Sequence, residues 1–571
     1  MAHYTMRADG TAADLAACLN GDPDIQGECM SLATQNALGV GGRPVAGDAM
    51  LLSDKDGDAD GIYRGIFVTW PGSGGTDVEY KNYPGHAPEI RSSSPVSTWS
   101  DESGNVWSAT VTTEPQQVFM DGQFGDRKID LSTVQGGNEF DWFWAANVLY
   151  IYAATDPDSR YALVEAGDVT RGINSSGLGY ITLDGLIFSH ANAIGVFFYN
   201  CSHITCKNCT VQWAFAQGLN FGASAYYSDI LIEDCIGRYN GTNGVNISSG
   251  NDASIADCTI RRVHAYENGR HQHNNPSTGY WNSEQRFNGG ILSFSPGDDA
   301  TFTNFVVEYC SAHDNGNATP QAGSISGNGF WFDSTKGTSG APNYLRFSTS
   351  YENNACGVYC ELADYTRVYG NVFYNNGKAS TNNGFSPAGM KVLGRGGDAN
   401  AHSAENNVFY NNIVSGCLYG IHCVTSEGFT ETPTPHVTGN IFKNNIVVNS
   451  TVADLRAVDG GDNSGTHGTG NIYDNNCFGA SPTFRWGTQE VSPYDMDDYT
   501  TYDSWETEHG EAWVQIEEDP VFTDSGSDDY TIAEGCPSIG SGDNLGSPYN
   551  IGLLPATEWV DAVVTDDRDD Y

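Results

Sequence analysis

The sequence predicts an all-β solenoid of stacked parallel strands, because two short phrases recur through its middle and turn residues separate their copies. The first phrase is a glycine followed by alternating apolar residues. Its copies are GVFFY, GLNFG, GVNIS, GILSF, GFWFD, GVYCE, GMKVL and GIHCV, starting at Gly195, Gly218, Gly244, Gly290, Gly329, Gly357, Gly389 and Gly420. Such alternation is typical of a strand with one buried face. Its recurrence, with no helical stretch between copies, is typical of a solenoid.

The second phrase lies out of phase with the first, so each coil should contain at least two strands. It appears as ITCKNCTV, ILIEDCIG, SIADCTI and FVVEYCSA, and later without cysteine as NVFYNNIV and NIFKNNIVVN. Asn and Gly suit the turns between these strands, and stacked coils should align the asparagines into an internal ladder. We expect Cys209, Cys235, Cys258 and Cys310 to stack inside as small apolar groups and not as disulfides.

The chain divides into three predicted regions. Residues 1–175 form an N-terminal cap with the first strands, since GDAMLL and GIYRGIFVTWPGSGG indicate short strands joined by Gly and Pro turns. Residues 176–480 contain the repeats and form the body of the solenoid. Residues 481–571 form a terminal coil and an acidic segment that caps the exposed end of the stack.

The charge of the chain excludes two classes of partner. With 71 Asp and Glu against 26 Lys and Arg, the net charge is −45, which disfavours nucleic acid and anionic membranes. No apolar run is long enough to cross a membrane. We therefore expect no nucleic-acid or membrane partner, and an acidic coat that keeps the surface solvated.

The first residues, MAHYTMRADG, lack a basic stretch followed by an apolar core, so no secretory signal is visible in this chain. Either a signal was removed, or the protein leaves the cell by another route such as release with phage particles. We expect an extracellular or virion location.

The two ends carry a resemblance to a known class of proteins. The opening contains YTMRADGTA, GDAMLL, GIYRG and TDVEYKNYPGHAPEI, and the closing contains DPVF, DYTIAEGCPSIGSG and YNIGLLP. With the repeats, these segments resemble right-handed parallel β-helix proteins of the pectate-lyase-like class. That class includes polysaccharide lyases, glycoside hydrolases, uronate epimerases, phage tailspike depolymerases and members without known activity. The resemblance implies the fold and a polysaccharide partner, with virion assembly or a homotrimer as further options, and leaves the reaction open.

The candidate site follows from the outward positions of the first phrase. If the first and third residues after each glycine point inward, the second and fourth project into solvent. Neighbouring coils lie about 4.8 Å apart, so residues in one column should touch. We predict four catalytic residues, Asp333, Glu361, Lys391 and Tyr359. The predicted substrate-binding residues are Trp331, His422, Arg395, Asn246, Phe294, His271, Arg286 and Trp281.

Two reactions suit these residues. Asp333 and Glu361, about 5 Å apart, could serve as acid and nucleophile of a retaining glycosidase. Alternatively, Lys391, Tyr359 or His422 could abstract the proton next to a uronate carboxylate. Arg395 or a carboxylate-bound Ca²⁺ would then neutralise that carboxylate. The resemblance implies a basic residue over such a sheet in lyases of this class. A third option is a protein that binds glycan, or builds a virion tail, without chemistry.

Two further segments bear on ligands. The long excursion RRVHAYENGRHQHNNPSTGYWNSEQRFNGG contains His271, Trp281 and Arg286, and could wall a substrate groove. The segment DKDGDADG, with Asp56, Asp58 and Asp60, resembles the first half of a calcium loop. A structural or substrate-bridging Ca²⁺ and a plain acidic turn both remain open for DKDGDADG, and we expect no organic cofactor.

Overall fold

The computed structural model describes residues 2–55, 61–224, 226–250, 253–269, 287–295, 301–316, 325–378, 386–394, 403–425, 437–459, 470–488, 495–509, 515–527, 529–533 and 536. The chain divides into two compact units. Unit 1 comprises Met1–Gly222, Ile230–Asn246 and Asn268–Phe287. Unit 2 comprises Ala223–Asp229, Ile247–Glu267 and Asn288–Tyr571.

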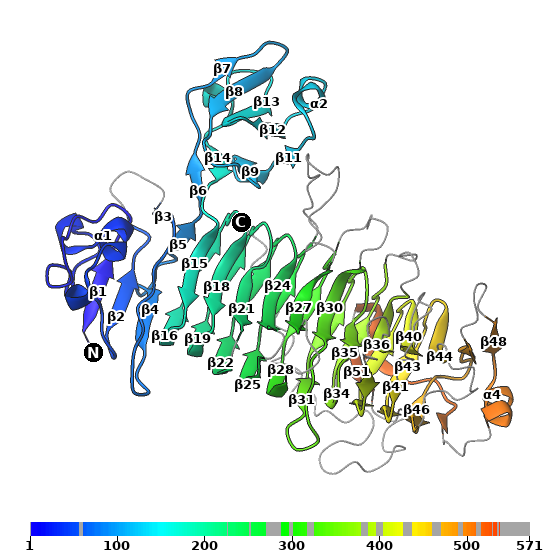
Figure 1. Ribbon diagram of the computed structural model, residues 1–571. Coiled ribbons are helices and arrows are strands. Elements are labelled where there is room, and N and C mark those ends of the chain that lie inside the picture. The colour runs from blue at the N-terminus through cyan, green and yellow to red at the C-terminus, as the bar shows by residue number, and fades with distance from the viewer. Residues whose placement is uncertain are drawn as a thin grey trace. The chain divides into compact units, whose positions relative to one another are not determined.

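Within the described residues, strands from successive coils form three long parallel sheets, which we name A, B and C (Figure 1). Sheet A has the order β1 (His3–Met6), β2 (Ala49–Leu52), β4 (Val78–Asn82), β16 (Gly179–Asp184), β19 (Ser202–Lys207), β22 (Tyr227–Glu233), β25 (Ile255–Arg261), β28 (Phe302–Glu308), β31 (Asn343–Arg346), β34 (Thr366–Tyr369), β38 (Val408–Tyr410), β42 (Ile441–Lys443) and β45 (Ile472–Asp474).

Sheet B has the order β3 (Ile62–Arg64), β5 (Glu89–Arg91), β17 (Ile187–Ser189), β20 (Thr210–Gln212), β23 (Ile236–Arg238), β26 (His264–Tyr266), β29 (Ser311–His313), β32 (Thr349–Tyr351), β35 (Val372–Tyr374), β39 (Ile413–Ser415), β43 (Ile446–Val448), β46 (Asn476–Cys477) and β49 (Gln515–Ile516).

Sheet C has the order β15 (Arg171–Ser176), β18 (Ile194–Tyr199), β21 (Leu219–Ala223), β24 (Asn243–Ser249), β27 (Phe287–Phe294), β30 (Ile325–Asp333), β33 (Val358–Glu361), β36 (Ala388–Gly394), β40 (Tyr419–Thr425), β44 (Ala453–Asp459), β47 (Phe484–Thr488) and β48 (Asp495–Tyr499). The last pair, β47 with β48, is antiparallel. Because the chain visits sheets C, A and B in turn, each coil has three strands, and the predicted right-handed parallel β-helix is confirmed.

The interior confirms the predicted alternation. The first phrase forms sheet C, and its first and third residues are buried, as Phe330 and Phe332 illustrate at 1% exposure each. All 14 cysteines are free and buried. The Cys209 and Cys310 thiols donate to backbone carbonyls of Lys207 and Glu308, both at 3.2 Å. Cysteine therefore acts here as a small core residue, as predicted.

The predicted asparagine ladder is present in unit 2. Asn371, Asn412, Asn445 and Asn476 follow one another in successive coils, and each side-chain amide donates to the next side-chain oxygen at 2.9–3.0 Å. The same oxygens accept backbone N–H groups, and the same amides donate to backbone carbonyls. The ladder thus satisfies turn backbone that the stack buries.

A small β domain, residues 93–167, is inserted between β5 and β15 of unit 1 (Figure 1). Its strands form two further sheets, in the orders β10-β9-β14-β6 and β11-β12-β13-β8-β7. They are β6 (Ser93–Pro95), β7 (Ser100–Asp101), β8 (Val106–Thr110), β9 (Val118–Met120), β10 (Gln123–Phe124), β11 (Asp126–Arg127), β12 (Asp141–Ala145), β13 (Val148–Tyr152) and β14 (Val164–Gly167). Trp142, Leu149 and Ile151 lie in its own core. The predicted short strands are present, and they enclose a core of their own, which the sequence analysis does not anticipate.

A buried ion network fastens the inserted domain to the β-helix within unit 1. Glu165 of β14 accepts from Arg64 of β3 at 2.5 Å and from Arg91 of β5 at 3.0 Å. His190, which follows β17, stacks on Phe119 of β9 with ring centroids 3.7 Å apart. Burial, helped by Arg91 and Arg64, holds the pKa of His190 well below its usual value, so this ring is neutral.

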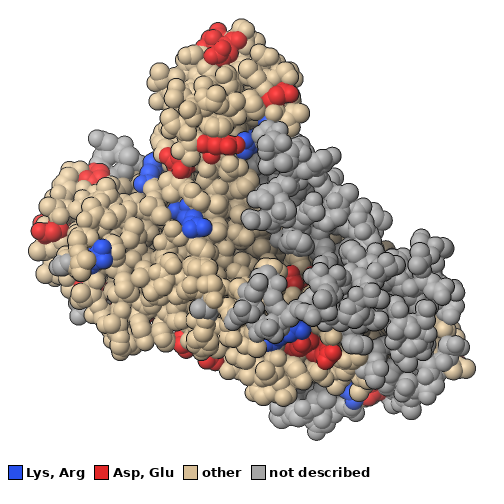
Figure 2. Space-filling view, viewed as in Figure 1, with Lys and Arg blue, Asp and Glu red and all other residues tan. Residues whose placement is uncertain are grey.

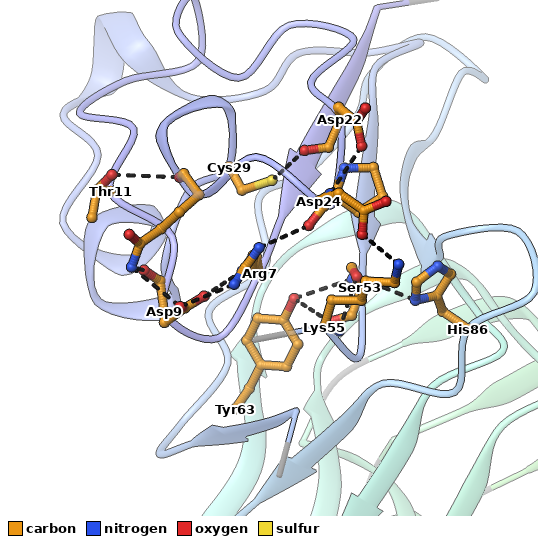
Figure 3. A network of polar contacts seen from close by, with 12 residues as sticks. Arg7, Asp9, Thr11, Asp22, Asp24, Cys29, Ser53, Lys55, Tyr63 and His86 are labelled. Carbon is orange, nitrogen blue, oxygen red and sulfur yellow. Dashed lines mark hydrogen bonds and ion pairs between the residues drawn. The ribbon is translucent and has the colours of Figure 1, made fainter. Parts of the chain in front are cut away.

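Polar contacts surround the start of unit 1, where Lys55, just after β2, pairs with Asp24 of the first segment (Figure 3). Arg7 bridges Asp9 at 2.5 Å and the Pro23 carbonyl at 3.1 Å. The Tyr63 hydroxyl donates to the Ser53 carbonyl at 2.9 Å. These contacts give the start of the stack a polar cap.

In unit 2, one segment after the last coil covers the end of the stack, and another packs on the outer face of sheet B. Trp505 of α4 (Tyr502–His509) stacks on Phe484 of β47 at 4.7 Å. Tyr530, from the hairpin of β50 (Phe522–Asp524) and β51 (Asp529–Ile532), packs on Tyr374 at 4.9 Å.

The remaining short elements are α1 (Leu32–Asn36), α2 (Leu131–Gln135), α3 (Pro157–Arg160), β37 (Ala404–Glu405) and β41 (Val437–Thr438). Among the described residues, no helix has the length and apolar character that crossing a bilayer requires.

Candidate functional site on the outer face of sheet C

Sheet C of unit 2 aligns the predicted site residues as expected. Trp331, Tyr359, Lys391 and His422 are register partners along β30, β33, β36 and β40. Asp333 and Glu361 are partners in the column two residues further on. The second and fourth positions after each glycine therefore form two adjacent outward columns.

The first half of the site is aromatic. The Trp331 and Tyr359 rings stack with centroids 5.5 Å apart. They belong to an apolar cluster, separate from the interior, whose members are Leu292, Trp331, Cys356, Tyr359, Leu393 and Val424, with the half-buried Phe294 against it. Leu393 is the register partner of Glu361, so an apolar side chain lies next to that carboxylate.

The second half of the site is basic and gathers around Ser386. The Ser386 carbonyl accepts from Lys391 Nζ at 3.1 Å and lies 3.2 Å from His422 Nδ1. The Ser386 hydroxyl lies 2.5 Å from Arg456 Nη1. Lys391 Nζ also lies 5.5 Å from the Tyr359 ring centroid, within reach of a cation–π contact. One residue thus contacts three consecutive basic side chains.

The chemistry of His422 follows from these contacts. A carbonyl oxygen can only accept a hydrogen bond, so Nδ1 carries the proton that faces Ser386. Burial, with the neighbouring charges of Arg456 and Lys391, holds the His422 pKa well below its usual value. His422 is therefore a neutral imidazole whose other nitrogen, Nε2, carries the lone pair.

The structure adds basic residues that sequence reasoning missed. Arg456 is the register partner of His422, and Arg485 is the register partner of Arg456. Arg485 forms an ion pair with Asp498 at 2.9 Å and is partly exposed. Asp454 occupies the place of the repeat glycine in β44, so a search based on glycine fails there. The alternation in ADLRAVD is the sequence pattern that could have located Arg456.

The two carboxylates differ in their surroundings. Glu361 is 2% exposed, whereas Asp333 is half-buried and accepts a hydrogen bond from the Ser334 hydroxyl at 3.1 Å. As partners on adjacent parallel strands, their backbones lie about 4.8 Å apart.

The expectation that these columns project into solvent was wrong. Trp331 is 1% exposed, and Tyr359, Lys391 and His422 are fully buried. Their outward side chains stack on one another, and the backbone at Ser386 lies against the basic ones. Charges and hydrogen bonds at this face therefore act in a medium of low dielectric, where they are stronger than in water.

The remaining predicted residues fall in other places. Asn246 lies in β24 of unit 1, where its amide donates to Asn220 at 3.0 Å. Arg395, His271, Trp281 and Arg286 lie outside the described residues, as do Asp56, Asp58 and Asp60. The described part of the chain contains no group of three or more His, Cys, Asp or Glu placed to hold a metal ion. Calcium binding stays a prediction.

Comparison with known proteins identifies the fold. No family model matches the chain, and no curated protein matches it. A solved structure described as the complex of XylC with xylose is similar over 78% of this chain and 75% of its own, at 12% identity and a TM-score of 0.52. Others are a glycoside hydrolase (10% identity, 70% and 88% covered, TM-score 0.47) and pectate lyase Pel9A (12% identity, 96% and 94% covered, TM-score 0.38). The three parallel sheets and the similarity to the XylC structure give the chain the fold of parallel β-helix proteins.

Proposed function

We propose that this protein is a polysaccharide-degrading enzyme whose active site is the outer face of sheet C in unit 2. The observation that carries the proposal is the register pairing of Asp333 with Glu361, beside the stacked Trp331 and Tyr359 rings. Carboxylates supply acid, base and nucleophile for glycosidic cleavage, and aromatic rings suit the C–H faces of sugars.

Hydrolysis with retention is the reaction that this pair supports best. Retaining glycosidases hold their two carboxyl groups about 5–5.5 Å apart, close to the strand spacing of a parallel sheet. Burial penalises a charged carboxylate, so the more buried Glu361 is assigned the acid. Asp333, less buried and hydrogen-bonded by Ser334, is assigned the nucleophile.

Elimination is the second candidate, and the basic row favours it. Lys391 and Arg456 would neutralise a uronate carboxylate, and the neutral His422 could accept the proton next to that carboxylate through Nε2. This route applies only to polysaccharides that contain uronate.

The fold gives general support. The similar structure with a TM-score of 0.52 is described as a complex with the sugar xylose. The substrate would be an extracellular or bacterial-surface glycan, which an extracellular or virion protein would meet. A phage-tail role, a homotrimer and a structural or substrate-bridging Ca²⁺ also belong to this proposal.

The test is incubation with a panel of xylan, pectate, alginate and bacterial capsules. New reducing ends indicate either reaction, and ultraviolet absorbance of an unsaturated uronate appears only for elimination. Asp333→Asn and Glu361→Gln should each lower kcat by at least about 100-fold if hydrolysis is the reaction. Lys391→Met and His422→Gln should each lower kcat to a similar extent if the reaction is elimination.

A control separates chemistry from folding. Thr110→Ala alters an exposed residue of β8 in the inserted domain and should leave turnover unchanged. Full activity in all four site variants would place the active site elsewhere. Binding to a glycan of the panel without any product would support the non-catalytic alternative.

A further inference from the structure

A second buried polar pair lies on the outward side of sheet C, in unit 1. Asn220 of β21 and Asn246 of β24 each follow a repeat glycine by two residues. Their neighbours Leu219 and Val245 fill the core, so the asparagine side chains point away from it. Asn246 Nδ2 donates to Asn220 Oδ1 at 3.0 Å, and the two residues are 6% and 7% exposed.

This pair leaves an acceptor unused. Asn246 Oδ1 is buried and has no hydrogen-bond partner among the described residues. Native proteins satisfy nearly all buried polar atoms, and an unsatisfied one costs stability, so such an atom requires an explanation. An ordered water or the hydroxyl of a ligand would supply the missing donor.

Another asparagine pair of unit 1, Asn240 with Asn268, has a structural role, and its amides make hydrogen bonds to the backbone. Asn240 donates to Asn268 at the same 3.0 Å. However, Asn240 also donates to the Val211 carbonyl at 3.1 Å, and its oxygen accepts from the Ala214 N–H at 3.0 Å. Asn268 donates to the Gly237 carbonyl at 2.8 Å. The amides of the Asn240–Asn268 pair are tied into backbone, whereas the Asn246 oxygen is not.

On the preceding strands β18 and β15, the residues in register with the Asn220–Asn246 pair carry no charge. Phe197 is the register partner of Asn220, and Asn174 is the partner of Phe197. Tyr199 is the partner of Gly222, so no side chain at that position of β21 covers the tyrosine ring, which stacks on Phe197 of its own strand with centroids 5.9 Å apart. In a chain with net charge −45, an outward group of amides and aromatics suits an uncharged ligand.

Arg171 is a cation at the edge of this group. The Arg171 guanidinium lies 4.3 Å over the Phe197 ring and donates to Asn174 at 2.9 Å. Arg171 therefore contacts residues of its own coil and of the next one. The strand register places these contacts on other coils than the one that carries Asn246.

We infer that Asn220, Asn246 and Tyr199 form a subsite for an uncharged sugar residue of a polysaccharide. A hydroxyl of the sugar donates to Asn246 Oδ1, and the C–H face of the ring packs on Tyr199. The inference rests on the proposed function, because that function makes a glycan the ligand. It adds that the recognised glycan contains an uncharged sugar unit.

The binding test uses xylohexaose, cellohexaose and mannohexaose in the background of Glu361→Gln, which should prevent their hydrolysis. Hexagalacturonate, the charged comparison, is tested in Glu361→Gln with His422→Gln, which should also prevent elimination. Affinity is measured by titration calorimetry for each background and for the same protein carrying Asn220→Leu and Asn246→Leu. At least one neutral hexasaccharide should bind, and the double substitution should weaken it by at least about tenfold, as expected for a lost buried hydrogen bond and a reshaped contact.

A melting experiment tells a binding role from a structural one. The matched control is Asn240→Leu with Asn268→Leu, which leaves backbone groups of the tied pair without partners. This control should lower the melting temperature strongly. Asn220→Leu with Asn246→Leu should leave it unchanged or raise it, because both partners of one hydrogen bond and an unsatisfied acceptor are removed together.

Each outcome of the two experiments either supports or overturns the subsite. Equal losses of melting temperature in the two double variants, or unchanged affinity, would overturn the subsite. No binding of any neutral hexasaccharide would also overturn it and assign the oxygen to water. Binding that depends on Asn246, in a protein that cleaves no glycan, would uphold the subsite and refute the proposed cleavage.

Discussion

At the scale of single residues, the repeat glycine is explained by the close approach of neighbouring coils. A Cβ added at Gly357 would lie 2.6 Å from the carbonyl oxygen of Gly389 in the next coil and 3.0 Å from the Phe373 ring. Real Cβ atoms are essentially never found so close to a backbone oxygen. The glycine therefore fixes the spacing of the stack, and the side chains after it fix the outward columns.

Gly357→Ala should therefore destabilise the fold by about 1–3 kcal/mol, as overpacking does elsewhere. Denaturant unfolding measures the loss. Gly340→Ala is the matched control, since a Cβ at Gly340 meets nothing within 4 Å. Equal stability of the two variants would mean that the stack yields easily and that the glycine has another cause.

The neutral state of His422 has a consequence for pH. Its folded pKa lies well below the value of about 6.5 that an unfolded chain has, because of burial, Arg456 and Lys391. Above about pH 6.5 the ring is neutral in both the folded and the unfolded state, so it contributes nothing to the pH dependence of stability. Below it only the unfolded state takes up the proton, so stability falls by up to about 1.4 kcal/mol per pH unit.

His422→Gln should remove this slope. Unfolding free energies of wild type and variant, measured from pH 8 to pH 5, should run parallel above about pH 6.5 and diverge below it, the wild type losing more. Parallel curves over the whole range would show that His422 titrates normally in the folded protein.

At the scale of elements, the buried cysteines make the coils inert to thiol reagents. Burial raises the pKa of Cys18, Cys29 and Cys477 to about 11, and that of Cys310 and Cys423 to about 12. Because only the thiolate reacts, a disulfide reagent should label almost no thiol in the native protein, and all 14 after denaturation. Melting should be the same with and without reductant. Rapid labelling of the native protein would indicate coils that open easily.

The elements show what the sequence could predict. The period of GFWFD, GVYCE and GMKVL gave the strands of sheet C with their register, because one phrase repeats in every coil. The inserted domain has no repeat, so its separate core could not be inferred from a period. Arg456 was missed because Asp454 stands where the pattern requires glycine.

Burial of the candidate site was the other failure. Alternation tells which side of a strand a side chain takes, and says nothing of what lies over that side. Ser386, which lies three residues before the repeat glycine Gly389 and outside the repeated phrase, packs against Lys391, His422 and Arg456. Contacts of this kind depend on tertiary structure and leave no pattern in the local sequence.

At the scale of the whole molecule, the net charge of −45 acts against the compact state. On the face that Figure 2 shows, the visible Lys and Arg side chains are scattered among Asp and Glu. Like charges repel over roughly a Debye length, which is about 30 Å at 0.01 M salt and about 8 Å at 0.15 M. Adding salt should therefore relieve repulsion between acidic groups that lie well apart.

The melting temperature should rise as sodium chloride increases from 0.01 M to 0.15 M, most steeply at the lowest concentrations, because screening changes most there. Sodium thiocyanate is the control: over the same range it should act alike, since screening depends on ionic strength and not on the anion. If the two salts acted in opposite directions, specific ion effects would be responsible. A melting temperature indifferent to both salts would mean that the uncompensated acidic side chains lie far enough apart for their repulsion to be small even at about 0.01 M salt.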